Sequence, residues 1–243
     1  QLGNLVNIYE LDLSQNHLSG AVPSSFTNLT NLCVPAVNAC HSYGLNLGYN
    51  WLTVPAAPED LAAFLTLKDP DWHLTQAISI ELGGTGDQLI SRQGDVELLF
   101  PSGSAPIGTT MTYIPLASPS YAIISGLAYG DLTFALEASV AKVISYSFSE
   151  PVTITLTYSE DTINPRLDDL GRIYYIPEDT LNLYFWDEMQ EIWIDATQTC
   201  TEPLSIIRNS DTNTISLEVC KTGEFTLLGE KQQTLIFLPM IRR

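Results

Sequence analysis

The sequence predicts a mainly β fold: the short end of a repeat solenoid with a helical cap, followed by one or two antiparallel β-sandwich domains. A leucine pattern occurs twice before residue 53, and alternating apolar strands fill most of the remaining chain. The 243 residues also exceed the usual size of one domain. The expected segments are repeats (1–57), a helical cap or linker (58–77), a first sandwich (78–150), a second sandwich half or domain (151–230) and a C-terminal tail (231–243).

The first repeat consists of apolar residues at fixed spacing around one asparagine. Leu11 and Leu13 are predicted to alternate on a short strand and point into the core, and Asn16 to satisfy backbone groups at the following turn. The full pattern is Leu5, Ile8, Leu11, Leu13, Asn16 and Leu18, with Leu18 closing the layer. Together with Leu18-Ser19-Gly20 and Pro23, it resembles the leucine-rich repeat subtype that carries L-S-G-x-I-P after the asparagine. That subtype is found in plant receptor ectodomains and many bacterial surface proteins.

A second repeat reproduces this core with Leu45, Leu47, Asn50 and Leu52. The two asparagines are 34 residues apart, where about 24 is usual for this subtype. The excess of ten residues matches the segment Cys33–Ser42, which carries two cysteines. We interpret this segment as an inserted loop, tied by a Cys33–Cys40 disulfide, in an irregular repeat that ends the array.

The segment from Pro58 to Trp72 is predicted to cover the end of the array. Pro58-Glu59-Asp60 has the chemistry of a helix start, and Asp69-Pro70-Asp71 that of a stop. The apolar positions at roughly helical spacing between them are Leu61, Phe64, Leu65 and Leu67. Because about three repeats are needed for a stable core, further repeats upstream or this cap must complete it. Since Gln1 is not an initiator methionine and the chain opens inside a repeat, we expect a longer precursor.

From Ile78 onward, apolar and polar residues alternate with the period of β-strands. β-Branched and aromatic residues dominate these runs, and turn-forming residues separate them at short intervals. The predicted strands are 96–100, 110–114, 152–158, 181–186, 192–194, 215–219 and 225–228. Many short strands separated by regular turns favour a β sandwich.

The first part of this β region carries a family resemblance. Gly83-Gly84 followed by Asp95–Gly103 is similar to the ZU5 domain, which opens on a Gly-Gly strand start and continues with G-V-x-L-x-x-P-x-G-A. The resemblance covers roughly residues 80–150 and implies a β sandwich. Whether residues 78–230 form one domain or two stays open.

The second part resembles modules that follow such domains in bacterial surface proteins. The resemblance is carried by Phe148–Val152 with the Thr- and Ile-rich strand after it, then Leu183–Asp187 and Trp193. Four aromatic residues gather here: Tyr184, Phe185, Trp186 and Trp193. Tyr184 and Trp186 share one face of the predicted strand, and Phe185 takes the other. A carbohydrate-stacking platform is one interpretation, but filling of the sandwich core is favoured.

No catalytic motif is complete in this sequence. Some ZU5 domains cleave themselves at His-Phe-Ser, but here Ser147 precedes Phe148-Ser149, so the serine lacks its base and is interpreted as the entry to a strand. No Gly-x-Ser-x-Gly, His-Glu-x-x-His, Walker or Rossmann pattern occurs. We therefore predict that the chain is not an enzyme. The alternative is a hydrolase with paired carboxylates in the β region.

Acidic residues outnumber basic ones, 28 to 10, for a formal net charge of −18. Binding to nucleic acid requires basic surface, so no nucleic-acid partner is predicted, and an anionic membrane surface is disfavoured for the same reason. No cofactor is predicted. Calcium is the one candidate, through Glu160-Asp161 or Asp168-Asp169 if these lie in loops.

The four cysteines form two local pairs, Cys33 with Cys40 and Cys200 with Cys220. Four cysteines allow three connectivities, and two short-range disulfides fit this spacing better than a zinc site. Disulfides indicate an oxidising compartment, and no apolar run reaches the roughly 18 residues of a membrane span. The sequence thus predicts a protein that is secreted or exposed at the cell surface.

The residues that flank the inward leucines of each repeat strand are predicted to point outward and contact a partner. They are Glu10, Asp12, Ser14, Asn46 and Gly48. The predicted function is recognition or adhesion through binding of a protein or a surface glycan. The hydrolase is the alternative from another class of function, and a passive spacer in a surface protein is a third interpretation. The tail Thr234–Arg243, TLIFLPMIRR, is interpreted either as a sorting or anchoring segment or as a last edge strand.

Overall fold

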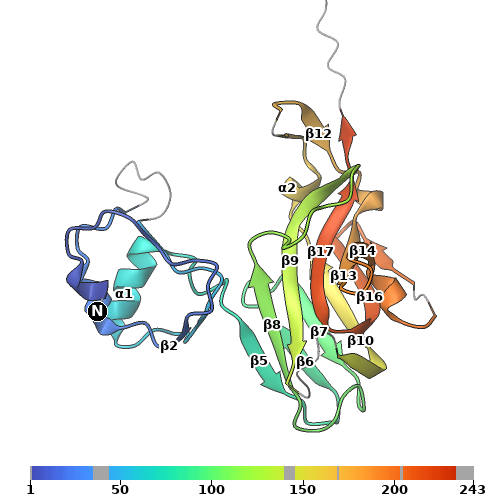
Figure 1. The fold of residues 1–243 in the computed structure, drawn as a ribbon, viewed down its shortest axis with the longest axis horizontal. Coiled ribbons are helices and arrows are strands. Elements are labelled where there is room, and N and C mark those ends of the chain that lie inside the picture. The colour runs from blue at the N-terminus through green and yellow to red at the C-terminus, as the bar shows by residue number, and fades with distance from the viewer. Residues whose placement is uncertain (1, 35–43, 140–145, 169, 203–204, 234–243) are drawn as a thin grey trace, which may run out of the picture.

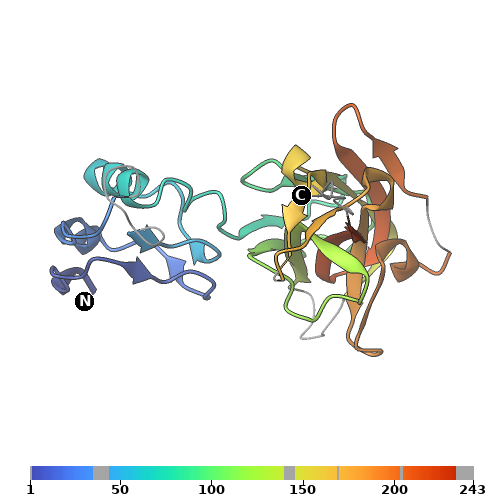
Figure 2. The same ribbon diagram turned by 90° about the horizontal axis from the view of Figure 1, so that it is seen from above.

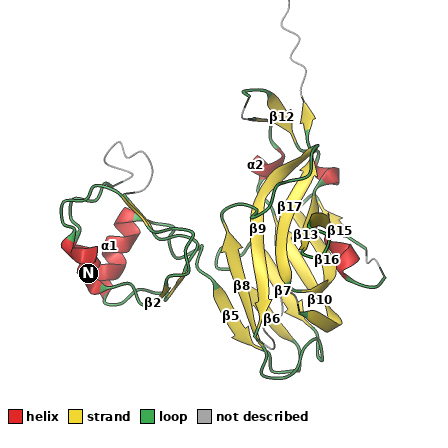
Figure 3. Cartoon of the chain, in the orientation of Figure 1, coloured by secondary structure: helices red, strands yellow, loops and turns green. Residues whose placement is uncertain are grey.

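The chain is mainly β and consists of a small N-terminal body followed by two antiparallel sheets packed as a sandwich (Figure 1). The computed structural model describes residues 2–34, 44–139, 146–168, 170–202 and 205–233. Figure 3 shows the longest helix in the N-terminal body and the long strands in the sandwich. The predicted C-terminal tail segment Thr234–Arg243 lies outside the described residues.

The N-terminal body is built from short elements and one helix. They are η1 (Leu2–Asn4), β1 (Leu11–Asp12), β2 (Ser19–Gly20), η2 (Ser24–Asn28), β3 (Leu45–Asn46), β4 (Trp51–Leu52) and α1 (Glu59–Lys68). β1 pairs in parallel with β3, and β2 with β4. The chain therefore forms a first rung (residues 2–23), a second rung (24–34 and 44–57) and a closing level (58–77), which Figure 2 shows stacked on one another.

The register of the two rungs follows the leucine pattern. Leu11 lies opposite Leu45, an offset of 34 residues, which equals the interval between Asn16 and Asn50. The second rung is packed on both sides, so Leu45 is fully buried, whereas Leu11 is only partly buried. The prediction that Leu18 closes its layer is wrong: its side chain is 41% exposed, because no described residue packs on that side of the first rung.

In the closing level, α1 covers the second rung. The chain after α1 then repeats the hydrogen bonds that the second rung makes to the first. Leu61 and Leu65 of α1 are fully buried against the second rung, as predicted, but Leu67 is 56% exposed because it lies on the far side of the helix. After α1, the Gln76 side chain accepts the backbone N–H of Leu52 at 3.0 Å, as Asn50 accepts that of Leu18 at 3.0 Å. Gln76 thus makes the contact to the second rung that Asn50 makes to the first, and we call Asn50 and Gln76 the ladder.

The sandwich contains a five-stranded and a six-stranded sheet. The first has the order β15-β16-β10-β7-β6 and the second β14-β13-β17-β9-β8-β5. The strands of the first are β6 (Asp87–Ile90), β7 (Val96–Phe100), β10 (Ser147–Thr157), β15 (Ile207–Asn209) and β16 (Thr214–Lys221). Those of the second are β5 (Ile78–Glu81), β8 (Thr110–Leu116), β9 (Leu127–Ala138), β13 (Asn182–Asp187), β14 (Ile192–Asp195) and β17 (Gly223–Glu230).

Smaller elements lie around the sandwich. A three-stranded sheet joins β11 (Arg166–Leu167), β12 (Ile173–Tyr175) and β18 (Gln232–Gln233). The helical turns are α2 (Glu160–Ile163), η3 (Glu178–Thr180) and η4 (Ala196–Thr199). Every predicted strand overlaps an observed one, whereas the long strand β9 was not predicted.

One core serves the whole sandwich. β10 pairs with β7 and β16, and β9 pairs with β8 and β17, so strands from both expected halves share each sheet. Alternate residues of the two sheets, such as Leu98, Ile154 and Phe225, meet in a single buried cluster. The expected boundary at residues 150/151 falls inside β10. Residues 78–230 therefore form one interleaved sandwich.

A disulfide joins Cys200, just after η4, to Cys220 in β16, with 4.9 Å between the Cα atoms. This confirms one of the two predicted pairs. The other predicted pair, Cys33–Cys40, includes Cys40, which lies outside the described residues. Near Cys33 the chain approaches itself closely: a Cβ on Gly44 would lie 1.8 Å from the Cys33 carbonyl oxygen, so this position requires glycine.

The four aromatic residues of the second half divide between the two faces of the paired strands β13 and β14. Phe185 is buried in the sandwich core, as favoured by the sequence. Trp186 and Trp193 lie opposite each other on the other face and are also buried, but outside that core. Tyr121 covers them, with its ring stacked on Trp186 at 3.9 Å between centroids. Trp186 and Trp193 are therefore covered and offer no open platform, whereas Tyr184 on the same face of β13 is half-buried.

Candidate recognition surface

The paired strands of the two rungs present polar side chains in adjacent positions. Asp12 lies directly opposite Asn46 in the register, and Asp12 is exposed while Asn46 is half-buried. Local bonds hold both side chains. The Asp12 carboxylate accepts the backbone N–H and the hydroxyl of Ser14 at 2.9 and 2.7 Å, and the Asn46 amide oxygen accepts the Gly48 N–H at 3.2 Å. We call Glu10, Asp12, Ser14 and Asn46 the strand face.

Four of the five predicted binding residues belong to this strand face, and the fifth does not. Glu10 is exposed just before β1, and Ser14 is half-buried just after it. Gly48 is buried, and a Cβ at this position would lie 3.0 Å from the hydroxyl of Thr75. Thr75 belongs to the closing level, whose rung-like course was not predicted. Gly48 therefore has no surface to offer a partner.

A buried acid lies behind the strand face. Asp69, 4% exposed, accepts the backbone N–H of Leu47 at 2.6 Å and so completes the edge of the second rung. Burial raises the pKa of Asp69 to about 6, the bond from Leu47 opposes this, and the nearby Asp71 and Asp12 carboxylates add to the rise. The strand face and its surroundings are thus acidic.

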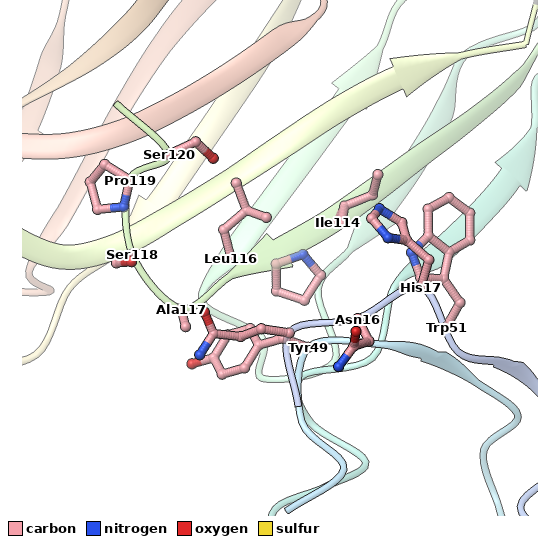
Figure 4. A pocket seen from close by; sticks show the side chains of 12 residues that line it. Asn16, His17, Tyr49, Trp51, Ile114, Leu116, Ala117, Ser118, Pro119 and Ser120 are labelled. Carbon is pink, nitrogen blue, oxygen red and sulfur yellow. The ribbon is translucent and has the colours of Figure 1, made fainter. Parts of the chain in front are cut away.

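A groove adjoins the strand face, between the loops that follow β1 and β3 and the sandwich (Figure 4). Residues 15–17, Tyr49 and Trp51 line it from the rungs, and residues 114–120 from the sandwich. Its volume is about 250 Å³. Figure 4 shows the rings of His17, Tyr49 and Trp51 on the rung side, facing the stretch from Ile114 to Ser120.

Backbone conformation places the rung side of this groove. Gln15 and Tyr49 directly precede Asn16 and Asn50. Both have left-handed backbone angles, with φ of 54° and 56°. The Gln15 N–H donates to the Gly48 carbonyl at 3.1 Å, and the Tyr49 N–H donates to the Thr75 carbonyl at 3.1 Å. These bonds fix the turns from which the side chains project.

The sandwich side of the groove is held by aromatic packing and hydrogen bonds. The Ser120 N–H donates to the Glu224 carboxylate at 2.7 Å, and the Trp193 indole N–H donates to the Ala122 carbonyl at 3.1 Å. Tyr121 between them is stacked on Trp186 and donates its hydroxyl to Glu188 at 3.1 Å. Sequence reasoning did not find this groove, although the aromatic residues beside Asn50 were a signal for it.

Two of the four candidate calcium ligands, Asp168 and Glu160, are engaged by protein groups, whereas Asp161 is exposed. Asp168 forms ion pairs with Arg172 at 2.7 Å and Lys231 at 3.0 Å, and these contacts lower the pKa of its carboxyl far below the usual range. Asp169 lies outside the described residues. Glu160 accepts a hydrogen bond from Asn213 at 3.3 Å. In the part of the chain that the structure describes, no three His, Cys, Asp or Glu side chains converge as a metal site would require.

Ser149, the serine of the incomplete Phe-Ser motif, is an exposed residue of β10 whose N–H donates to the Ser104 carbonyl at 2.9 Å. No family model matches the chain, and no curated protein is significantly similar to it. Among the described residues, no helix combines the length and apolar character needed to cross a membrane.

Proposed function

We propose that this chain is a non-catalytic recognition or adhesion module that binds a protein or a surface glycan through the strand face. In this proposal the N-terminal body is the end of a leucine-rich repeat solenoid, and the sandwich is a ZU5-like domain that supports it. The parallel pairing of the rungs and the ladder of Asn50 and Gln76 support the repeat assignment.

The observation that carries the proposal is the pairing of Asp12 with Asn46 on adjacent strands. Two polar side chains side by side, each already held by a bond to its own strand, lose little rotamer freedom when a partner binds. The acidic surroundings of Glu10, Asp12 and Asp71 favour a basic patch on a protein over a glycan that carries acid groups.

The proposed place of action is outside the cell or at its surface. The Cys200–Cys220 disulfide is typical of proteins from oxidising compartments.

A charge reversal tests the strand face. The double variant Asp12→Arg/Asn46→Arg is compared with wild type for binding to a panel of extracellular proteins and surface glycans. We expect it to lose binding by at least about tenfold, as for central interface residues. Glu137→Arg, at an exposed position of β9, is the control and keeps binding. Equal binding by both variants would rule out the strand face.

The spacer alternative is supported by the direct passage of the chain from the closing level into β5. The Ala77 N–H donates to Asn50 in the second rung at 2.8 Å, and the next residue, Ile78, already pairs with Tyr113. A chain without a flexible linker suits a stalk. Unchanged binding of the Asp12→Arg/Asn46→Arg variant in the charge-reversal experiment would favour the spacer function.

The hydrolase alternative would act in a hollow of the sandwich. A shallow hollow of about 460 Å³ on the five-stranded sheet is lined by Asp87 and Glu218, among other residues. Paired acids across a cleft are the machinery of glycoside hydrolysis. The variants Asp87→Asn and Glu218→Gln, assayed with chromogenic glycosides, test this: activity present in wild type and lost in both variants would replace the recognition proposal.

A further inference from the structure

We propose that the groove between the rungs and the sandwich binds an uncharged saccharide. The groove contains none of the four strand-face residues, so this is a second site, beyond the proposed recognition function. The sugar ring is expected to stack on Trp51 or Tyr49, with its hydroxyl groups bonded by the polar side chains around them.

The charge of the lining selects a neutral ligand. None of its residues is Asp, Glu, Lys or Arg, and its titratable side chains are His17 and Tyr49. The chain as a whole has 28 acidic residues and a net charge of −18, so an uncharged lining sets this groove apart from the general surface. A charged ligand would lose hydration there and meet no opposite charge among the lining residues. A neutral ligand avoids that cost.

The chemical groups of the lining match those of a sugar. A pyranose has an apolar face of C–H groups and a rim of hydroxyl groups, and Trp and Tyr combine a flat apolar ring with one polar atom. The side chains of Gln15, His17 and Trp51 form no hydrogen bond with any described residue, so their polar atoms are available to the ligand. The Asn16 amide group donates to Leu13 and Ser14, which leaves its oxygen as an acceptor.

The groove is formed before any ligand arrives. Tyr49 occupies a left-handed position that glycine or asparagine would adopt with less strain, and its ring is held in the groove at that cost. The opposite wall is fixed by the Tyr121–Trp186 stack and by the bond from Ser120 to Glu224. Binding therefore requires little ordering of the walls.

The size of the groove favours a short contact with a saccharide. A volume of about 250 Å³ is slightly below the range of about 300–1,000 Å³ that accommodates drug-sized ligands. It suits one sugar ring held at the bottom. The groove is open to solvent, so a neighbouring sugar unit can extend out of it.

Calorimetry and tryptophan fluorescence with soluble cello-, chito-, malto-, xylo- and manno-oligosaccharides test the proposal. We expect at least one series to bind at millimolar concentration and to change the fluorescence. Trp51→Ala should weaken this binding at least about tenfold, as for a central aromatic contact. Trp51→Tyr keeps a ring and should weaken it less, which separates stacking from a loss of folding.

Tyr9→Ala is the control. It removes an aromatic residue that is 51% exposed but lies outside the groove, and it should bind the saccharide as wild type does. The proposal is overturned if no series binds, if affinity survives Trp51→Ala, or if acidic oligogalacturonate binds more tightly than the neutral series. Binding of a proline-rich peptide in place of every sugar would assign the groove to a protein partner.

Discussion

Asn50 shows how one side chain can organise two rungs. Its buried amide donates to the carbonyls of Leu13, Leu47 and Gly48 at 2.9, 3.0 and 3.2 Å. Its oxygen accepts the Leu18 N–H, so it bonds both the first rung and its own. Asn16, its counterpart, is exposed and bonds only within the first rung. Asn16 and Asn50 hold equivalent repeat positions, but only Asn50 is buried. Asn50 is therefore expected to contribute more to the free energy of unfolding.

We predict that Asn50→Ala destabilises the N-terminal body by about 3 kcal/mol, because buried backbone groups lose their partners. Asn16→Ala is the matched control and should cost less than about 1 kcal/mol, since water can replace the side chain at an exposed site. Denaturant dependence of amide exchange in the two rungs measures both. Equal losses in the two variants would contradict the ladder interpretation.

Asp69 makes the stability of the N-terminal body depend on pH. Its pKa rises from 3.8 to about 6 on folding, chiefly through burial, so the native state holds a proton that the unfolded chain has released. The contribution of the protonated acid is complete below pH 3.8 and is lost as the pH rises through about 6. The N-terminal body should therefore become less stable across this window.

The variant Asp69→Asn tests this prediction. An amide oxygen can still accept the Leu47 N–H, and the variant should show no loss of stability between pH 3.8 and about 6 from this site. The free energy of unfolding of the N-terminal body, measured across that range, gives the result. Asp60→Asn, at the exposed start of α1, should keep the wild-type profile. A parallel profile for Asp69→Asn would refute the assignment.

At the scale of elements, the sequence predicted strands where alternation was clean and missed β9, where it was not. β7 was predicted with its observed bounds because buried and open positions alternate along it. β9 contains Gly130-Asp131, which is typical of a turn, followed by Ala, Leu and Glu residues that favour helix. In the structure Asp131 has φ of 62° in a bulge between Tyr129 and Thr133, and tertiary pairing overrides local preference.

A local sequence pattern likewise predicted the pairing of the two rungs but did not predict the closing level or the groove. The leucine pattern predicted the register of Leu11 with Leu45 because it repeats at a constant offset. The closing level escaped prediction because its ladder residue is Gln76, in a stretch without the leucine spacing. Most of the strand face followed from strand alternation, whereas the groove depends on residues 114–120, more than 60 positions from Trp51, and no local pattern brings such segments together.

The Cys200–Cys220 disulfide closes a loop with a sequence separation of 20 residues. In the chain-entropy description, a loop of this length stabilises the folded state by about 3 kcal/mol. We predict that Cys200→Ala/Cys220→Ala destabilises the sandwich by about that amount, measured from the exchange of β16 amides in denaturant. Reduced wild type should match the variant in β16, and a loss below about 1 kcal/mol would contradict the prediction.

Tyr121 holds the loop that forms the sandwich wall of the groove. Its parallel stack on Trp186, with an interplanar angle of 5°, is worth about 0.5–1.5 kcal/mol. We predict that Tyr121→Ala accelerates amide exchange in residues 117–122 up to about tenfold. Tyr121→Phe, which keeps the ring but loses the bond to Glu188, is the control and should change exchange little. Unchanged exchange in both variants would show that other contacts hold the loop.

At the scale of the whole molecule, the two bodies are joined without a linker. Gln76 forms a parallel bridge with Asn50, and Ala77 donates to the same residue, while Ile78 begins the edge strand β5 of the sandwich. The chain thus leaves one hydrogen-bonded layer and enters another at consecutive residues. The groove, which has one wall on each body, keeps its shape only if this passage is stiff.

Insertion of Gly-Ser-Gly-Ser between Ala77 and Ile78 should therefore uncouple the bodies without unfolding either. Wild type is expected to tumble as one particle in NMR relaxation, with one correlation time for the amides of the rungs and of the sandwich, and the insertion to give two. The same insertion after Met189, which is 94% exposed at the β13–β14 turn, is the control and should leave one correlation time. Two correlation times already in wild type would mean that the passage is flexible, and a groove with one wall on each body could not then hold a ligand in a fixed geometry.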